Sequence, residues 1–141
     1  MSDTLQNFRF HHSIQVRYSD MAMMGHANNA VYLTYLELAR LAYFRELKTR
    51  SQSNTALVLA HANMDFHLPL TPEVEPVAHL RTVKFGSSSM TMDNLITDRS
   101  HKRQFYTATL VLVAIDTQTG RPVPIPDIEK QKIIDYEPAL D

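Results

Sequence analysis

The sequence predicts an α+β protein in which an antiparallel sheet of about five strands wraps around one long helix. Apolar side chains recur at helical spacing within residues 30–47, at Tyr32, Tyr35, Leu36, Ala39 and Tyr43. Four long strand patterns follow this helix, and short turns join them, which favours antiparallel pairing. A chain of 141 residues suits a single domain spanning residues 1–141.

The elements follow from local patterns along the chain. Partial alternation of apolar residues predicts a first strand at residues 8–18. Residues 21–25 are predicted as a loop, and Asn28 or Asn29 suits the N-cap of the helix. The later strands are predicted at residues 56–68, 74–85, 89–97 and 104–116. Residues 128–141 are either a short helix or a tail. A sheet of this kind leaves an edge strand that a second copy can cover, so a homodimer is expected.

Composition and charge narrow the function classes. Hydrophobic residues make up 44% of the chain and charged residues 21%, which is typical of a folded protein. The net charge is −1 without a basic run, so no nucleic-acid partner is expected. The chain has no cysteine, which excludes disulfides and thiolate chemistry and fits a cytoplasmic protein. No metal-ligand spacing, signal peptide or membrane-spanning apolar run is evident.

The segment RYSDMAMMGHANNAVYLTYLELAR, residues 17–40, carries the chemistry. Asp20, His26, Asn28 and Asn29 lie in a loop that leads directly into the amphipathic helix. The first turn of a helix has free backbone N–H groups and a partial positive charge. These groups can stabilise a developing oxyanion, so the segment predicts a hydrolase or acyl-binding site.

Each of these side chains has two interpretations. Asp20 can act as a general base on water, or it can cap the turn by accepting backbone hydrogen bonds. His26 can act as base or acid, or it can bond only to a neighbouring backbone group. Asn28 and Asn29 can cap the helix, and a capped helix still presents N–H groups to an oxyanion.

The motifs of this segment and their order resemble the hotdog-fold thioesterases, in particular the 4-hydroxybenzoyl-CoA and acyl-CoA or acyl-ACP thioesterase branch. The resemblance rests on Arg-Tyr-x-Asp at 17–20, Gly-His-x-Asn-Asn at 25–29 and Tyr-Leu-x-Tyr-x-Glu-x-Ala-Arg at 32–40. Asp-Phe-x-x-Pro-Leu at 65–70, Gly-Ser-Ser-Ser at 86–89 and Thr-Gly-Arg-Pro-Val-Pro at 119–124 support it. It covers nearly the whole chain.

The resemblance implies a thioesterase that acts on acyl-CoA or acyl-ACP at a subunit interface, in a homodimer or a dimer of dimers. It implies no cofactor besides the CoA or pantetheine part of the substrate. Asn29 falls where the family's oxyanion-hole N–H is found, and Asn28 and Tyr32 are expected to contact substrate. Related branches use a helix glutamate as the catalytic carboxylate, which would be Glu37. The alternative for Glu37 is an ion pair with Arg40.

Further substrate contacts are predicted away from the loop. Lys84 and the turn of Gly86, Ser87 and Ser88 offer a cation, hydroxyls and backbone N–H groups for a CoA or carrier phosphate. The alternative is an ordinary solvated hairpin. Asp65 is expected either to approach the partner's site or to make a polar contact at the end of a strand.

The sequence departs from the family pattern at one position. This branch commonly has Asp-x-Asp in the loop, and the second carboxylate is the usual nucleophile or base, whereas the chain has Asp20-Met21-Ala22. Alanine cannot exchange a proton. A hotdog protein that binds an acyl thioester without cleaving it is therefore the alternative function. A dehydratase of the same fold is disfavoured because its usual helix His motif is missing.

Overall fold

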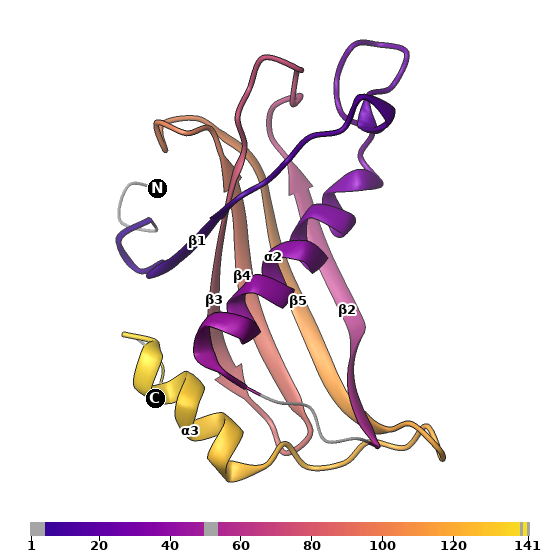
Figure 1. Cartoon of the computed structure of the whole chain (residues 1–141), viewed down its shortest axis with the longest axis vertical. Coiled ribbons are helices and arrows are strands. Elements are labelled where there is room, and N and C mark those ends of the chain that lie inside the picture. Colours follow the sequence, from indigo (N-terminus) through magenta and orange to yellow (C-terminus); the bar gives the residue numbers. More distant parts are fainter. Residues whose placement is uncertain (1–4, 50–53, 139, 141) are drawn as a thin grey trace.

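The computed structural model describes residues 5–49, 54–138 and 140, and a five-stranded antiparallel sheet forms its centre (Figure 1). The strands are β1 (Phe10–Ser13), β2 (Thr55–Phe66), β3 (Val77–Phe85), β4 (Ser89–Thr97) and β5 (Gln104–Asp116). Their order across the sheet is β1-β3-β4-β5-β2. The predicted α+β class and the five-stranded antiparallel sheet are confirmed.

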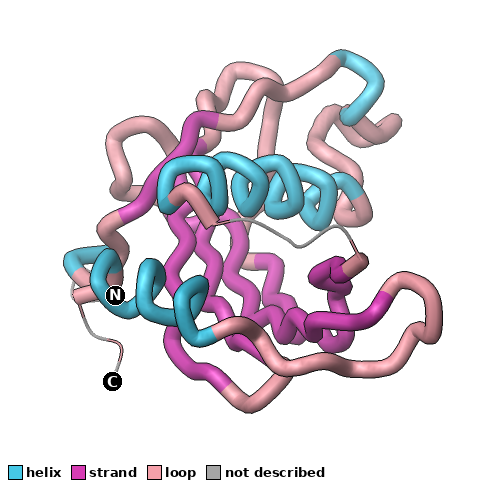
Figure 2. Tube along the Cα trace, turned by 60° about the horizontal axis from the view of Figure 1, so that its bottom comes forward, coloured by secondary structure: helices cyan, strands magenta, loops and turns pink. Residues whose placement is uncertain are grey.

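One long helix, α2 (Val31–Leu47), lies across one face of the sheet, which curves around it (Figures 1 and 2). Six residues of α2 are buried against the sheet: Tyr32, Tyr35, Leu36, Ala39, Tyr43 and Leu47. The last five lie three, four, seven, eleven and fifteen residues after Tyr32, which places all six on one face of the helix. The helix predicted at residues 30–47 is confirmed, with a start one residue later.

The first strand is much shorter than predicted. The apolar pattern predicts an extended segment at residues 8–18, but β1 covers only Phe10–Ser13 and pairs with the start of β3. Pro76 precedes β3 and has no N–H to donate, so the ladder cannot continue past it. The carbonyl of Pro76 still accepts one hydrogen bond from the Ile14 N–H, at 2.9 Å. The same proline sets the start of β3 at Val77 and not at residue 74.

The C-terminal segment forms helix α3 (Asp127–Tyr136), which lies beside the C-terminal half of α2 (Figures 1 and 2). Glu137 follows α3 directly and is only 6% exposed. Its Oε2 accepts hydrogen bonds from the Thr82 N–H at 2.6 Å and the Tyr43 hydroxyl at 2.5 Å. A buried carboxylate therefore fixes the end of the chain to both β3 and α2.

Strand β2 is one edge of the sheet and pairs with β5 alone among the described strands. Leu57 and Leu59 pair with Ala114 and Leu112, which face the core, yet both leucines are 39% exposed. Phe66 at the far end of the strand is 46% exposed. A 12-residue edge with uncovered apolar side chains is a template for pairing with another chain.

Candidate active site

A buried carboxylate, Asp20, holds the loop ahead of α2. The Asp20 side chain is 1% exposed, and its Oδ1 accepts hydrogen bonds from Nε and Nη2 of Arg17 at 3.1 and 2.8 Å. Its Oδ2 accepts from the Arg17 N–H and from the Tyr35 hydroxyl, both at 2.8 Å. The Asp20 carbonyl accepts from the Asn28 N–H at 3.0 Å. Asp20 thus connects both ends of the loop to α2.

These contacts keep Asp20 ionised. Burial by itself would raise the pKa of Asp20, but the hydrogen bonds from Arg17 and Tyr35 outweigh burial and lower this pKa. Burial and the adjacent carboxylate raise the pKa of Tyr35, so its phenol stays protonated and keeps donating. A carboxylate that already accepts four hydrogen bonds is poorly placed to take a proton from water. The geometry favours the turn-capping interpretation of Asp20, and its catalytic role stays a prediction.

The loop folds back on itself and places His26 next to the start of α2. The Ala22 N–H donates to the His26 carbonyl at 2.7 Å, and Gly25 adopts a φ of +82° that side chains disfavour. The Ala27 N–H donates to the Leu70 carbonyl at 2.7 Å. The half-buried His26 ring has Nδ1 3.2 Å from the Ala27 carbonyl oxygen. Because a carbonyl only accepts, Nδ1 is the donor in this contact, and a neutral His26 ring then has its lone pair on Nε2.

Asn28 and Asn29 shape the first turn of α2. The Asn28 Oδ1 accepts from the Ala30 N–H at 3.1 Å, and the Asn28 carbonyl accepts from the Val31 N–H at 2.9 Å. The prediction that Asn28 or Asn29 is the N-cap is wrong, because the N-cap is Ala30 and no side chain caps the helix. The Asn29 N–H donates to no acceptor within the described residues, and it lies at the positive end of the helix dipole. This N–H is available to an oxyanion.

Tyr32 and Glu37 lie apart from the loop chemistry. Tyr32 is 2% exposed and stacks on Tyr106 with ring centroids 4.7 Å apart, so it is a core residue of the protomer. Glu37 is exposed on α2, six residues beyond Val31 and so about 9 Å further along the helix axis. The described residues contain no salt bridge between Glu37 and Arg40, the pair that the sequence offers as the alternative.

Asp65 lies on the sheet face opposite α2. Its neighbour Phe66 contacts Tyr32 of the helix, with ring centroids 5.7 Å apart, so the alternating Asp65 side chain is on the other face. There Asp65 lines a cavity of about 220 Å³ with Thr107 and Asp93. Within one protomer, Asp65 is not brought together with the loop ahead of α2.

The β3–β4 turn lies at the end of the sheet near α3, away from the first turn of α2 (Figure 1). Lys84, Gly86 and Ser87 are exposed there, and Ser88 is half-buried. The Gly86 carbonyl accepts from Lys130 Nζ at 3.1 Å. One protomer therefore does not place these predicted phosphate contacts beside the loop.

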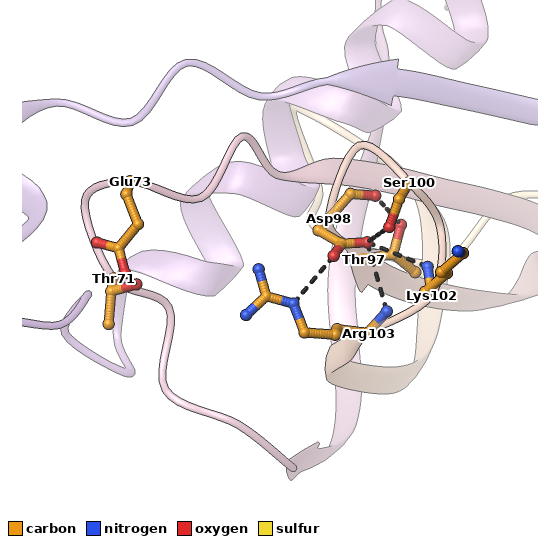
Figure 3. A network of polar contacts seen from close by, with 7 residues as sticks. All are labelled: Thr71, Glu73, Thr97, Asp98, Ser100, Lys102 and Arg103. Atoms are coloured by element: carbon orange, nitrogen blue, oxygen red, sulfur yellow. Dashed lines mark hydrogen bonds and ion pairs between the residues drawn. The ribbon is translucent and has the colours of Figure 1, made fainter.

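Another carboxylate, Asp98, holds the β4–β5 turn (Figure 3). Its Oδ1 accepts from the Ser100 hydroxyl at 2.9 Å and the Lys102 N–H at 3.1 Å, and its Oδ2 accepts from Arg103 Nε at 3.0 Å. Burial would raise the pKa of Asp98, but these hydrogen bonds lower it to about 2. Asp98 uses the same turn-capping chemistry as Asp20 without any contact to α2.

Sequence reasoning did not identify Arg17 and Tyr35 as the residues that hold Asp20. Asp20 lies three residues after Arg17, and its carboxylate accepts a hydrogen bond from the Arg17 N–H, as in a capping box. The spacing of these two residues is therefore a local sequence signal for their contact. Tyr35 is 15 residues from Asp20, and its hydroxyl contact depends on how the loop returns to the helix. No local pattern predicts that contact.

The structure adds two observations on ligands and membranes. Within residues 5–49, 54–138 and 140, no group of three or more histidines and carboxylates is arranged to hold a metal ion. In the same part of the chain, no helix is long and apolar enough to cross a membrane.

Comparison with known proteins identifies relatives of the chain. The thioesterase-like superfamily matches residues 16–133. YsmA, an uncharacterized protein of Bacillus subtilis (strain 168), is 29% identical over 129 residues, which are 91% of this chain and 87% of YsmA. A thioesterase of Thermus thermophilus, solved in complex with coenzyme A and Zn, is 31% identical with a TM-score of 0.81, over 94% of this chain and 96% of that one.

The fold is shared more widely than the sequence. The PA5185 protein of Pseudomonas aeruginosa strain PAO1 is 19% identical and has a TM-score of 0.84, with 96% of each chain covered. At that identity the likeness supports the fold alone. The superfamily match covers most of the chain, and the Thermus thioesterase agrees with it in sequence as well as in structure. The chain therefore belongs to the thioesterase-like superfamily, and the hotdog-fold resemblance is confirmed.

Proposed function

We propose that this protein hydrolyses an acyl thioester of coenzyme A or of acyl carrier protein, at a site between two copies of the chain. Membership of the thioesterase-like superfamily supports the reaction class. The observation that carries the proposal is the Asn29 N–H, which has no partner within the described residues and lies just ahead of α2. A loop held by Asp20 fixes this N–H in place.

In this proposal the thioester carbonyl oxygen binds at the Asn29 N–H. A donor of this kind stabilises the transition state by about 2.7–4 kcal/mol in comparable acyl transfer. His26 Nε2 takes a proton from water as the water oxygen attacks the carbonyl carbon. The tetrahedral intermediate then collapses, the C–S bond breaks, and the leaving thiolate takes the proton from His26. The products are a free acid and a thiol.

The proposed site needs a second copy because one protomer leaves it open. The uncovered edge of β2 supports antiparallel pairing with the same strand of another chain. That pairing reverses the second protomer, so its β3–β4 turn comes to the sheet end that holds the first turn of α2. Lys84 of the partner subunit is then the candidate phosphate contact. A dimer of dimers stays a prediction.

The proposal is tested by measuring thiol release from short, long and aromatic acyl-CoAs and from the matching carrier-protein thioesters. We expect wild-type turnover on at least one class, and a loss of about 100-fold or more in His26→Ala. His12→Ala is the matched control because this exposed histidine lies on β1, away from the loop. No thiol release from any thioester would contradict the proposal.

A second candidate function is acyl-thioester binding without hydrolysis, and Ala22 favours it. Ala22 lies where the branch carries its second carboxylate, and its N–H closes the loop onto His26. This candidate predicts saturable binding of an acyl-CoA with no turnover, and new turnover in Ala22→Asp. Strong wild-type activity that Ala22→Asp leaves unchanged would exclude it.

A further inference from the structure

Three histidine rings meet on the sheet face opposite α2. His11 of β1 and His79 of β3 are cross-strand partners, and their neighbours Phe10 and Leu80 belong to the core under α2. Because side chains alternate along a strand, the two histidines lie on the other face. His101 of the β4–β5 turn supplies the third ring. The ring centroids of His79–His101, His11–His101 and His11–His79 lie 4.8, 5.8 and 6.0 Å apart, so the rings join three separate segments of the chain.

His79 is the buried member of this cluster of His11, His79 and His101, which we call the histidine junction. His79 is 2% exposed, whereas the other two histidines are exposed at the surface. The Phe8 ring packs edgewise against His79 with centroids 6.2 Å apart, and Leu95, the cross-strand partner of His79 on β4, is also buried. A positive charge on His79 would be costly in these surroundings, because apolar and uncharged groups replace water around the ring.

The hydrogen bonds of His79 suit a neutral ring. The Thr97 hydroxyl donates its one proton to the Asp98 carbonyl at 2.9 Å. This hydroxyl therefore accepts from His79 Nε2, which is also 2.9 Å away, and the contact places the proton of the neutral ring on Nε2. A protonated His79 would carry a second N–H at Nδ1, and Nδ1 has no hydrogen-bond partner within the described residues.

The charges around the histidine junction do not favour a proton on His79. The nearby carboxylates have other partners, namely Arg81 for Asp93, Arg103 for Asp98, Arg99 for Glu75 and the Thr71 hydroxyl for Glu73. Lys102 adds a further positive charge to the β4–β5 turn. None of the described histidines takes part in a salt bridge. Burial and, to a smaller extent, repulsion from His101 and His11 lower the pKa of His79 to about 4, so this ring is neutral at pH 7.

Release of β1 would uncover His79. Among the described strands β1 is an outer strand that pairs over four residues with β3 alone, and both His11 and Phe8 leave with it. Once uncovered, His79 regains the ordinary histidine pKa of about 6.5. Between that pH and about pH 4 the released form binds a proton that the paired form does not. The paired form therefore loses stability as pH falls through this range.

We propose that the histidine junction is an acid-sensitive contact, which holds β1 on β3 at neutral pH and releases β1 when His79 binds a proton. Only residues 14–16 lie between β1 and Arg17, which holds the buried Asp20. Release of β1 therefore also loosens the loop ahead of α2. The inference concerns regulation by pH and does not depend on the proposed hydrolysis.

The experiment measures amide hydrogen exchange by NMR at pH 7.5 and pH 5, expressed as protection factors so that the intrinsic pH dependence of exchange cancels. A proton that only the released form binds weakens the pairing by up to about tenfold for each pH unit below 6.5. We therefore expect the protection factors of the β1–β3 ladder to fall at least about tenfold between the two pH values. Those of the β2–β5 ladder at the other edge should change by less than about threefold.

His79→Gln removes the titrating ring but keeps a donor for the Thr97 hydroxyl, so we expect its β1–β3 protection factors to be nearly independent of pH. His12→Gln is the matched control on β1, because its ring stacks on Phe10, with centroids 6.4 Å apart, and takes no part in the histidine junction. This control should keep the wild-type pH dependence. The His79 ring resonance is titrated in parallel. In His101→Gln we expect it to titrate at higher pH than in wild type, because a repelling ring is lost.

Three results would overturn the inference. The first is a wild type with equal β1–β3 protection factors at both pH values. The second is a folded His79→Gln protein that loses this protection at pH 5 as wild type does. The third is a His79 ring that titrates near the ordinary histidine pKa in the folded wild type. This last measurement decides the question even if His79→Gln does not fold.

Discussion

Helix α2 is anchored near each end by a tyrosine that donates to a buried carboxylate. Toward the N-terminal end Tyr35 donates to Asp20, and toward the C-terminal end Tyr43 donates to Glu137. Both carboxylates also accept a backbone N–H, from Arg17 in one case and from Thr82 in the other. The two anchors therefore have the same kinds of hydrogen bond. They differ because Asp20 also contacts a cation, whereas Glu137 forms no salt bridge within the described residues.

The contact with a cation separates the directions of the two pKa shifts. Asp20 contacts the Arg17 guanidinium, and its pKa is lowered despite burial. Glu137 forms no salt bridge within the described residues, and its Oε1 is buried without a partner. Burial raises the pKa of Glu137 against the opposing hydrogen bonds and the positive charges of Arg81 and Arg9. Burial alone therefore does not determine the direction in which the pKa of a buried carboxyl group shifts.

The largest expected effect is in Asp20→Asn. The amide cannot accept from both Arg17 and Tyr35 as the carboxylate does, and a hydrogen bond to a charged group contributes about 1.5–3 kcal/mol. We expect the free energy of unfolding at pH 7, measured by urea titration, to fall by about that amount. Because the folded pKa of Asp20 is lowered, its contribution exists above the ordinary aspartate pKa and is lost as pH falls through the folded value.

Asp98→Asn is the control for this variant, since Asp98 caps a turn without touching α2. We expect it to be less stable than wild type at pH 7, with a difference that disappears as pH falls through the folded pKa of about 2, and with no change at the loop ahead of α2. An Asp20→Asn protein as stable as wild type at pH 7 would contradict the anchor assigned to Asp20.

Glu137→Gln is expected to act in the opposite direction. Because the folded pKa of Glu137 is raised, wild type loses stability as pH rises from the ordinary glutamate pKa through the folded value. The amide carries no charge and avoids that loss. We expect the variant to equal wild type at pH 4 and to exceed it at pH 8, by about 1.4 kcal/mol for each unit of pKa shift. A Glu137→Gln protein that is less stable than wild type at pH 8 would refute this comparison.

The smallest effect is expected in Tyr35→Phe. Asp20 keeps its three contacts with Arg17, so the variant loses only one hydrogen bond to a charged group, and we expect a loss at the low end of about 1.5–3 kcal/mol. Tyr43→Phe is the counterpart, and it also leaves the Thr82 hydroxyl without its partner. Thermal melting at pH 7 should therefore rank Tyr43→Phe as the more damaging variant. The reverse order would show that the two anchors are not comparable.

Much of the fold could be predicted from sequence because local patterns determine it. Strands β4 and β5 match their predicted bounds of 89–97 and 104–116, since turn residues close them at both ends. Residues 14–18 have the pattern of a strand but lie outside the ladder, which ends with one hydrogen bond from Ile14 to Pro76 on the neighbouring segment. That limit depends on a residue far away in the chain, so periodicity could not show it.

The candidate site was predictable in its loop but not in its remote parts. Asp20, His26 and Asn29 are close in sequence, so the structure keeps them near the first turn of α2. Asp65 is separated from that turn by strand alternation, which places its side chain on the opposite sheet face. Lys84 lies at the far end of the same sheet, so only a second copy can bring such a residue to the site.

The most direct test of the account compares thiol release from acyl thioesters by Asp20→Asn and Glu137→Gln, both at pH 7 and below their melting temperatures. The proposed mechanism places the chemistry at the N-terminal end of α2. It therefore predicts a large loss of kcat/KM in Asp20→Asn, whose loop and Asn29 N–H are no longer held, and near wild-type kcat/KM in Glu137→Gln. Equal rates in the two variants, or a loss confined to Glu137→Gln, would contradict it.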